Sequence, residues 1–195
     1  MYHVHTTEAY ILSRVSHGET NALIVLFTRD FGRIQAVAQG VRKTTSKLNP
    51  FLQEYAFVRI SLVRGKEWWR IVTVEGIGSL YVSARGDERR LRIITHIIKL
   101  LNRLVQGEEC NEVLFDSLSE VFQKLSDRTL TKEEVVSLEI VGVLRLLYHL
   151  GYVSRSDETV ALSEEVITKD ILTRVHTLRK SYISSINASL KITHL

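Results

Sequence analysis

The chain has 195 residues, 45% of them hydrophobic, with 26 Lys and Arg against 22 Asp and Glu. This length and composition support a full hydrophobic core in one large or two small domains. The sequence contains no apolar run of about 18 residues, so it predicts no membrane span. The single cysteine, Cys110, excludes an intrachain disulfide and a multi-cysteine zinc site, and it favours a reducing cytoplasm. Residues 1–10 show no secretory signal pattern.

The first eighty residues have the pattern of short β-strands separated by turns. Apolar and polar side chains alternate most clearly over residues 57–62, and glycine-containing turns punctuate the apolar runs. The predicted strands are Tyr10–Val15, Ala22–Thr28, Arg33–Gln39, Ala56–Arg64 and Trp68–Glu75. Five strands in so short a stretch predict a small closed barrel, which leaves no strand edge exposed.

The longest connection in this predicted barrel, Gly40–Tyr55, is cationic. Between residues 31 and 53 the chain carries four basic side chains and no acidic one. These basic residues are Arg33, Arg42, Lys43 and Lys47. Long loops on small barrels commonly carry the function, and cations mixed with hydroxyl groups and glycine amides suit phosphate binding.

A solubilising surface loop would have the same composition, so the distribution of charge along the chain is informative. Residues 1–76 contain 10 basic and 6 acidic side chains, whereas residues 79–195 contain 16 of each. The whole net positive charge therefore belongs to the predicted barrel. Such an asymmetry favours a polyanionic partner.

Further cationic and aromatic residues of the barrel are weaker candidates for such a site. Arg33 and Arg70 would also pair with Glu54 or Glu67 across strands, and Arg64 and Lys66 flank a hairpin turn of a common surface type. Trp68 and Trp69 are adjacent on one strand and therefore point to opposite faces. One of them is expected in the core, and the other is a candidate platform for base stacking or for packing.

From residue 87 the hydrophobic period becomes that of α-helices. The first predicted helix covers Leu91–Leu104 and stops at Gly107, and the second covers Val113–Leu125. The change of period near Tyr81–Asp87 predicts a domain boundary. We therefore expect an α+β protein, with a small closed five-stranded barrel over residues 1–81 and an all-helical domain over residues 82–195.

A third helix is announced by Thr131 with Glu134 three residues later, a capping box, and it ends at Gly151. Because this helix is apolar nearly all round, we expect it at the centre of a bundle. An apolar stripe with three- and four-residue spacing over residues 167–190 predicts one long or two short helices after it.

Motifs for catalysis and metal binding are missing from the sequence. No nucleophile elbow, Walker loop, His-Glu-x-x-His helix or Gly-x-Gly-x-x-Gly turn occurs, so we expect no enzymatic activity. His3 and His5 share one face of a strand, but no third ligand is nearby. We expect no bound metal and no cofactor.

Several short motifs of the barrel occur in an order that resembles the amino-terminal domain of the RecO family of bacterial recombination mediators. They are Gly18-Glu19, Phe27-Thr28-Arg29, Gly32-Arg33, Ala38 to Lys43 and Ser46 to Leu48. In the helical part, residues 144–147 (Leu-Arg-Leu-Leu) and 150–152 (Leu-Gly-Tyr) are similar to the central helix of that family and its end.

The resemblance implies an OB-fold barrel and a helical domain without an active site. It also implies binding of single- and double-stranded DNA, annealing of complementary strands, and loading of RecA, together with RecR, onto DNA coated by single-strand-binding protein (SSB). The expected location is the bacterial cytoplasm, at the nucleoid. Many members carry a four-cysteine zinc motif after the Leu-Gly-Tyr position, but residues 152–157 here contain no cysteine.

The resemblance further implies contact between the helical domain and the acidic, apolar-ended tail of SSB. Residues 171–195 contain four Lys and Arg and no acid, and Arg174, Arg179 and Lys180 are the candidates for charge contacts. The same residues would also serve to pack the bundle and match the helix macrodipole. Two other functions remain open for the whole chain, namely an RNA- or ribosome-associated OB protein and a protein–protein adaptor.

Overall fold

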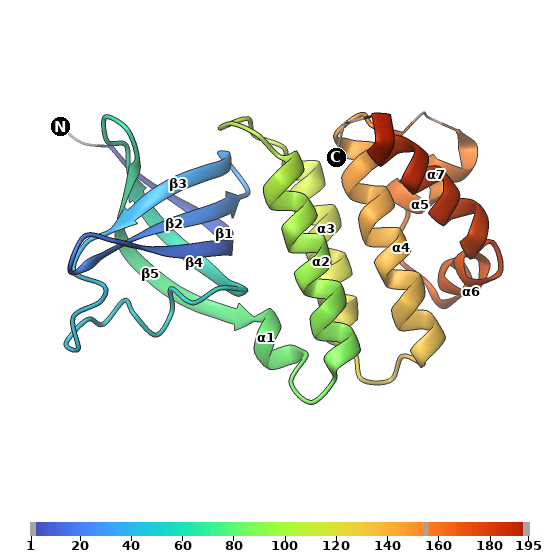
Figure 1. Ribbon diagram of the computed structural model, residues 1–195, viewed down its shortest axis with the longest axis horizontal. Helices are drawn as coiled ribbons and strands as arrows, with labels where there is room; N and C mark the ends of the chain where they lie inside the picture. Colours follow the sequence, from blue (N-terminus) through green and yellow to red (C-terminus); the bar gives the residue numbers. More distant parts are fainter. Residues whose placement is uncertain (1–2, 154–155, 193–195) are drawn as a thin grey trace. The chain divides into compact units, whose positions relative to one another are not determined.

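The computed structural model describes residues 3–153 and 156–192, and these form two compact units. One unit comprises Met1–Arg85 together with Val105–Glu112, and the other comprises Gly86–Leu104 and Val113–Leu195. Figure 1 shows the first unit as strands and the second as helices. The assignment of separate functions to the two parts stays a prediction. Ser154 and Arg155, which belong to the segment 152–157 where the resemblance had raised the question of a zinc motif, lie outside the described residues.

The first unit is a closed five-stranded barrel, which confirms the predicted fold. Its strands are β1 (Val4–His17), β2 (Asn21–Thr28), β3 (Gly32–Ala38), β4 (Ala56–Val63) and β5 (Trp69–Ser79). They are hydrogen-bonded in the closed order β1-β2-β3-β5-β4, and only the β3–β5 pairing is parallel. Shifts of register in β1 and β5 are typical of strands that coil tightly around a small barrel.

The barrel core follows from the alternation seen in the sequence. In β3, buried residues alternate strictly with half-buried ones, and in β4 they alternate with half-buried or exposed ones except at the last residue. Buried side chains from all five strands meet inside the barrel, and two loop residues, Val41 and Leu52, join them. β1 begins at Val4 rather than at the predicted Tyr10, because residues 4–10 pair with β4 along its whole length.

The second unit is helical, and the chain also forms a short helix where the barrel ends. The helices are α1 (Leu80–Ser83), α2 (Glu88–Leu104), α3 (Glu112–Leu125), α4 (Lys132–His149), α5 (Asp157–Glu164), α6 (Lys169–Thr177) and α7 (Arg179–Ile192). The stripe over residues 167–190 thus forms two helices. Neither α1 nor α5 was predicted, because each is too short to show a clear apolar period. Among the described residues, no helix is both long and apolar enough to span a bilayer.

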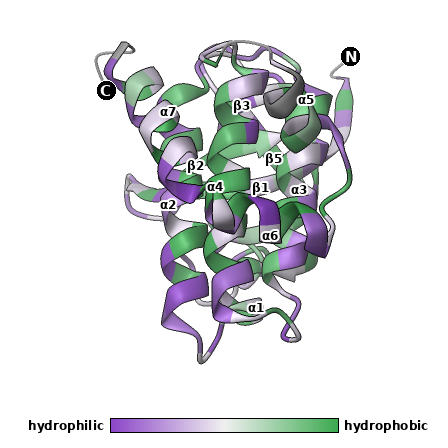
Figure 2. Ribbon diagram, turned by 90° about the vertical axis from the view of Figure 1, so that its right-hand side faces the viewer, coloured by the Kyte–Doolittle hydropathy of each residue, from purple (hydrophilic) through white to green (hydrophobic). Residues whose placement is uncertain are grey.

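Helix α4 has the central position that its apolar sequence predicted. It packs against α2, α5, α6 and α7, and Figure 2 shows it among α2, α6 and α7. The predicted capping box is present at its start. The Glu134 amide donates to the Thr131 hydroxyl at 3.2 Å, and the Thr131 amide donates to a Glu134 carboxylate oxygen at 2.7 Å.

Arg145, a charged residue of this central helix, is only 1% exposed. Its guanidinium donates to the Glu120 carboxylate at 2.6 Å and to the Ser117 carbonyl at 3.2 Å. It also donates to two carbonyls beyond α4, those of Leu162 and Glu165. A single buried cation therefore connects α4 to α3 and to the segment around α5.

Candidate nucleic-acid interface

The long cationic loop, residues 40–55, is fixed to the barrel at both ends. Val41 and Leu52 are fully buried in the barrel core, and the Arg42 amide donates to the Thr20 carbonyl at 2.9 Å. Gly40 has a φ of +62°, a left-handed conformation that glycine adopts readily. The loop is therefore attached to the barrel near both of its ends, with its exposed cations between them.

A residue that the sequence did not single out, Arg14 on β1, holds the second half of this loop. Its guanidinium donates to the Leu52 carbonyl at 2.9 Å and to the Asn49 side-chain oxygen at 2.8 Å. Its backbone amide donates to the Glu54 carboxylate at 3.1 Å. These partners are 35 to 40 residues away in sequence, so no local pattern reveals the contact.

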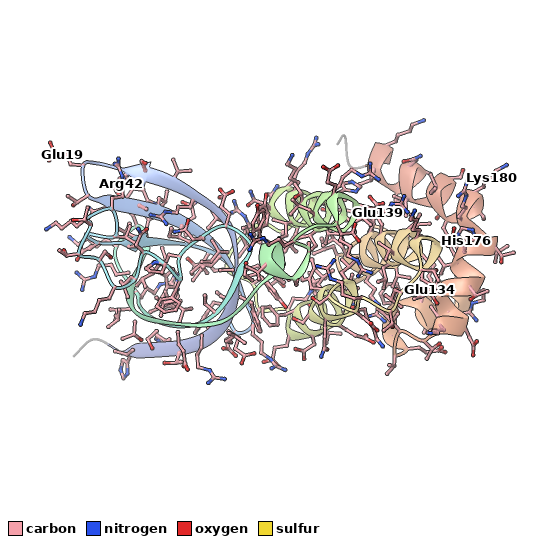
Figure 3. The ribbon with its side chains drawn as sticks, turned by 90° about the horizontal axis from the view of Figure 1, so that it is seen from below. Glu19, Arg42, Glu134, Glu139, His176 and Lys180 are labelled. Carbon is pink, nitrogen blue, oxygen red and sulfur yellow. The ribbon has the colours of Figure 1, made fainter. Side chains whose placement is uncertain are left out.

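The candidate phosphate ligands Arg42, Lys43 and Lys47 are all exposed on this loop. The Arg42 guanidinium donates to the Gly18 carbonyl, in the β1–β2 turn, at 2.9 Å. Figure 3 shows Arg42 and Glu19 at the same end of the barrel, so one acidic residue accompanies this cationic group. Because the Gly18 acceptor is a neutral backbone carbonyl, this contact does not itself neutralise the positive charge of Arg42.

The two tryptophans have different environments. Trp69 is 3% exposed, packs against His5 and Phe31, and donates its indole N–H to the Glu108 carboxylate at 3.1 Å. Trp69 is therefore a core residue and leaves the set of stacking candidates. Trp68 is half-buried, and its ring meets the ring of His17 edge to face, with centroids 5.1 Å apart.

The contacts of Trp68 and Arg42 bring three loops of the barrel together. His17 ends β1, directly before the β1–β2 turn whose Gly18 binds Arg42. Trp68 belongs to the β4–β5 turn and contacts His17. The cationic loop and the partly exposed tryptophan thus border one turn, and cations next to an aromatic platform are the combination that binds single-stranded nucleic acid.

The remaining cationic candidates of the barrel differ in accessibility. Arg64 forms an ion pair with Glu108 at 2.8 Å and lies over the Trp69 ring at 5.2 Å, so part of its charge is neutralised. Lys66 and Arg70 are exposed in and next to the same turn. Arg33 is half-buried on β3, opposite Phe27 of β2. No local pattern in the sequence indicates Glu108, because it lies 39 residues or more from its two partners.

The helical unit has a groove of about 410 Å³ between α2, α4 and α7. Its walls are mainly apolar, and Arg179 and Lys180 lie at its border, whereas Arg174, on α6, does not line it. On the groove wall, His96 Nδ1 is 2.7 Å from a Glu139 carboxylate oxygen. Two of the three predicted peptide contacts therefore lie beside one apolar groove.

Clusters with the composition of a metal site do not occur in the described part of the chain, in which no three His, Cys, Asp or Glu side chains are grouped. Cys110 is exposed, with its Sγ 3.5 Å from the Arg29 carbonyl oxygen. Both features are compatible with the expected binding function, although neither tests it.

Comparison with known proteins connects the barrel to one family. Residues 1–80 match the model of the family "Recombination protein O N terminal". The chain is 30% identical to DNA repair protein RecO of Dehalococcoides mccartyi over 129 residues, which is 65% of this chain and 50% of that protein. It is 27% identical to the protein of the same name from Alkaliphilus metalliredigens over 135 residues, 69% of this chain and 52% of the other. The chain spans about half the length of these relatives.

Proposed function

We propose that this chain, whose residues 1–80 match the amino-terminal domain of the RecO family, is a DNA repair and recombination protein whose barrel binds DNA through its phosphates. The observation that carries this proposal is the anchored loop, which presents Arg42, Lys43 and Lys47 within the domain that the family model matches. Backbone cations bind nucleic acid independently of sequence, so both single- and double-stranded DNA are suitable ligands.

The experiment that tests this proposal is a salt titration of DNA binding. Charge reversal of Arg42, Lys43 and Lys47 to Glu is expected to weaken binding of a single-stranded oligomer. Each lost phosphate contact is expected to reduce the slope of log K against log salt by about 0.7 for a single strand. An unchanged affinity at every salt concentration would show that the loop is not the site.

A matched control keeps the total charge change constant. Reversal of Lys99, Arg103 and Lys132, which are exposed on α2 and α4, adds the same negative charge to the helical unit. If the proposal is correct, this control reduces affinity much less than the loop variant does. Competition with RNA of the same sequence separates DNA binding from the RNA-binding alternative.

We further propose that binding serves strand annealing and recombinase loading rather than catalysis. In this role the protein would act in the bacterial cytoplasm at the nucleoid, anneal complementary strands, and work with RecR to place RecA on DNA coated by SSB. The test is fluorescence-monitored annealing of complementary strands coated with SSB. A rate equal to that without the protein would rule out the annealing role.

The groove of the helical unit supports a proposal for contact with SSB. The acidic, apolar-ended SSB tail would place its carboxylates on Arg179 and Lys180 and its aliphatic side chains between α4 and α7. Titration of a labelled tail peptide into the full chain is expected to show binding that Arg179→Glu and Lys180→Glu weaken. Arg174→Glu is the control, because Arg174 does not line the groove, and an equal effect would contradict this location.

A further inference from the structure

A second candidate surface lies on the barrel unit, at the far end of the cationic loop. It is an open cleft of about 850 Å³, formed by the end of the loop, the last residues of β5 and helix α1. Two exposed aromatic side chains line it, Phe51 with 42% and Tyr81 with 53% of its surface exposed, together with the half-buried Tyr55. Ile77 and Val82, with 46% and 63% of their surface exposed, enlarge the apolar surface. Such a grouping of exposed apolar residues commonly marks a binding site.

The floor of this cleft is backbone, and it supports one of the two aromatic rings. β5 has glycine at positions 76 and 78, and both line the cleft. The Phe51 ring lies directly against Gly76, where an added Cβ would be 2.8 Å from the ring carbon Cδ1. One side of the Phe51 ring is therefore packed against the backbone, while much of its surface faces solvent. A rigid, partly exposed aromatic ring is the element on which unpaired bases stack.

Continuity with the phosphate-binding loop indicates what occupies the cleft. Phe51 follows Lys47 by four residues, so even a fully extended chain would separate their Cα atoms by only about 14 Å. The chain here is not extended, because the Phe51 amide donates to the Leu48 carbonyl at 3.1 Å. A strand whose phosphates contact Lys47 thus carries its neighbouring bases to within reach of this ring.

We propose that this cleft is a nucleobase subsite for single-stranded DNA, in which bases stack on Phe51 and Tyr81 while the phosphates contact the cationic loop. The proposal rests on the proposed DNA binding and adds to it a selectivity for unpaired strands. The bases of a duplex already stack on one another, and they do not reach such a cleft. Because every base has an aromatic face, the subsite is tolerant of sequence.

The experiment compares two oligomers that differ only in their bases, namely oligo-dT and an oligomer of equal length that contains abasic residues. The full chain is expected to bind oligo-dT at least about fivefold more tightly, since base–aromatic stacking contributes at this level or above. The variant Phe51→Ala with Tyr81→Ala is expected to lose about this factor for oligo-dT and little for the abasic oligomer. Its salt slope should stay that of the parent, because no phosphate contact is removed.

Controls separate the cleft from other stacking positions. Val72→Ala removes an equally exposed apolar side chain of β5 that does not line the cleft, and it should retain the preference for oligo-dT. Trp68→Ala removes the other stacking candidate, and the effect of the double variant should persist in that background. Far-ultraviolet circular dichroism and tryptophan fluorescence verify that each variant is folded.

The outcomes distinguish this inference from the proposed function. Equal affinity of the double variant and the parent for oligo-dT would overturn the inference, as would an equal loss for both oligomers. If the cleft instead bound a protein partner, the presence of bases in the oligomer would not change its affinity. Photocrosslinking with 5-iodouracil DNA gives a second measurement. The crosslink is expected to form at Phe51 or Tyr81. If only the triple variant of the cationic loop weakens binding, the DNA-binding proposal holds and the nucleobase subsite is wrong.

Discussion

Replacement of Arg145 by methionine is expected to destabilise the helical unit strongly while leaving the barrel unaffected. The guanidinium is buried and bonds to four groups, the Glu120 carboxylate and the carbonyls of Ser117, Leu162 and Glu165. Removal of one partner of a buried ion pair costs about 3–5 kcal/mol, because the remaining charge is left without compensation. Glu120 keeps one bond, from the Ile167 amide at 2.7 Å, and its side chain is 27% exposed to water, so the loss is expected at or below the lower end of that range.

The assay uses the position of the two tryptophans of the chain, both of which belong to the barrel unit. Tryptophan fluorescence therefore reports unfolding of the barrel, whereas circular dichroism at 222 nm is dominated by the helices. With a denaturant slope of about 2 kcal/mol/M in urea, a loss of about 3 kcal/mol lowers the midpoint of the helical transition by about 1.5 M. The fluorescence midpoint should stay within error of the parent.

Arg103→Met provides the control, because Arg103 is exposed on α2 and such substitutions usually change stability by less than about 0.5 kcal/mol. An unchanged dichroism midpoint for Arg145→Met would refute the structural role assigned to this arginine. A parallel shift of both midpoints would refute the separate response of the two units.

Two further predictions concern acid stability and close packing. Burial acts to raise the pKa of the Asp87 carboxyl, but hydrogen bonds from the Arg90 amide and guanidinium and from the Arg89 amide hold it below its ordinary value. The parent should therefore lose stability as the pH falls below about 4, and urea midpoints measured against pH should show a smaller loss for Asp87→Asn. Gly18→Ala and Gly32→Ala both place alanine at a φ of +63°, which costs about 1–2 kcal/mol. Of these two substitutions, only the one at Gly32 would also bring the new Cβ into collision with the Glu109 carbonyl oxygen. Fluorescence-monitored unfolding should thus show an additional loss of about 1–3 kcal/mol for Gly32→Ala, and equal losses would contradict the packing argument.

The sequence was most informative where the evidence is local. Alternation of apolar and polar residues located all five strands, and the Thr131–Glu134 spacing located the start of α4, because a pleated strand and a capping box are defined by neighbouring residues. The exposure of the loop cations also follows from local composition. Local composition does not indicate which tryptophan side chain points into the barrel, because that depends on how β5 enters it.

Contacts between distant residues account for what the sequence left unpredicted. Arg145 lies in an apolar helix and has its partners 17 to 28 residues away, so its burial has no local signal. Similarly, Phe51 and Tyr81 are separated by 30 positions, and only the path of β4 and β5 brings them into one cleft. Side-chain functions that depend on topology therefore require the structure.

The two anchors of the cationic loop, Val41 and Leu52, have a consequence for the evolution and engineering of this protein. Both side chains belong to the barrel core, and Leu48 between them packs against it, so the core depends on these three loop positions and not on the exposed residues of the loop. The conformational cost of a longer connection is small, about 0.6 kcal/mol for each doubling of length. The barrel is therefore a scaffold on which this segment can be exchanged, so that charge, length and ligand preference change independently of the fold.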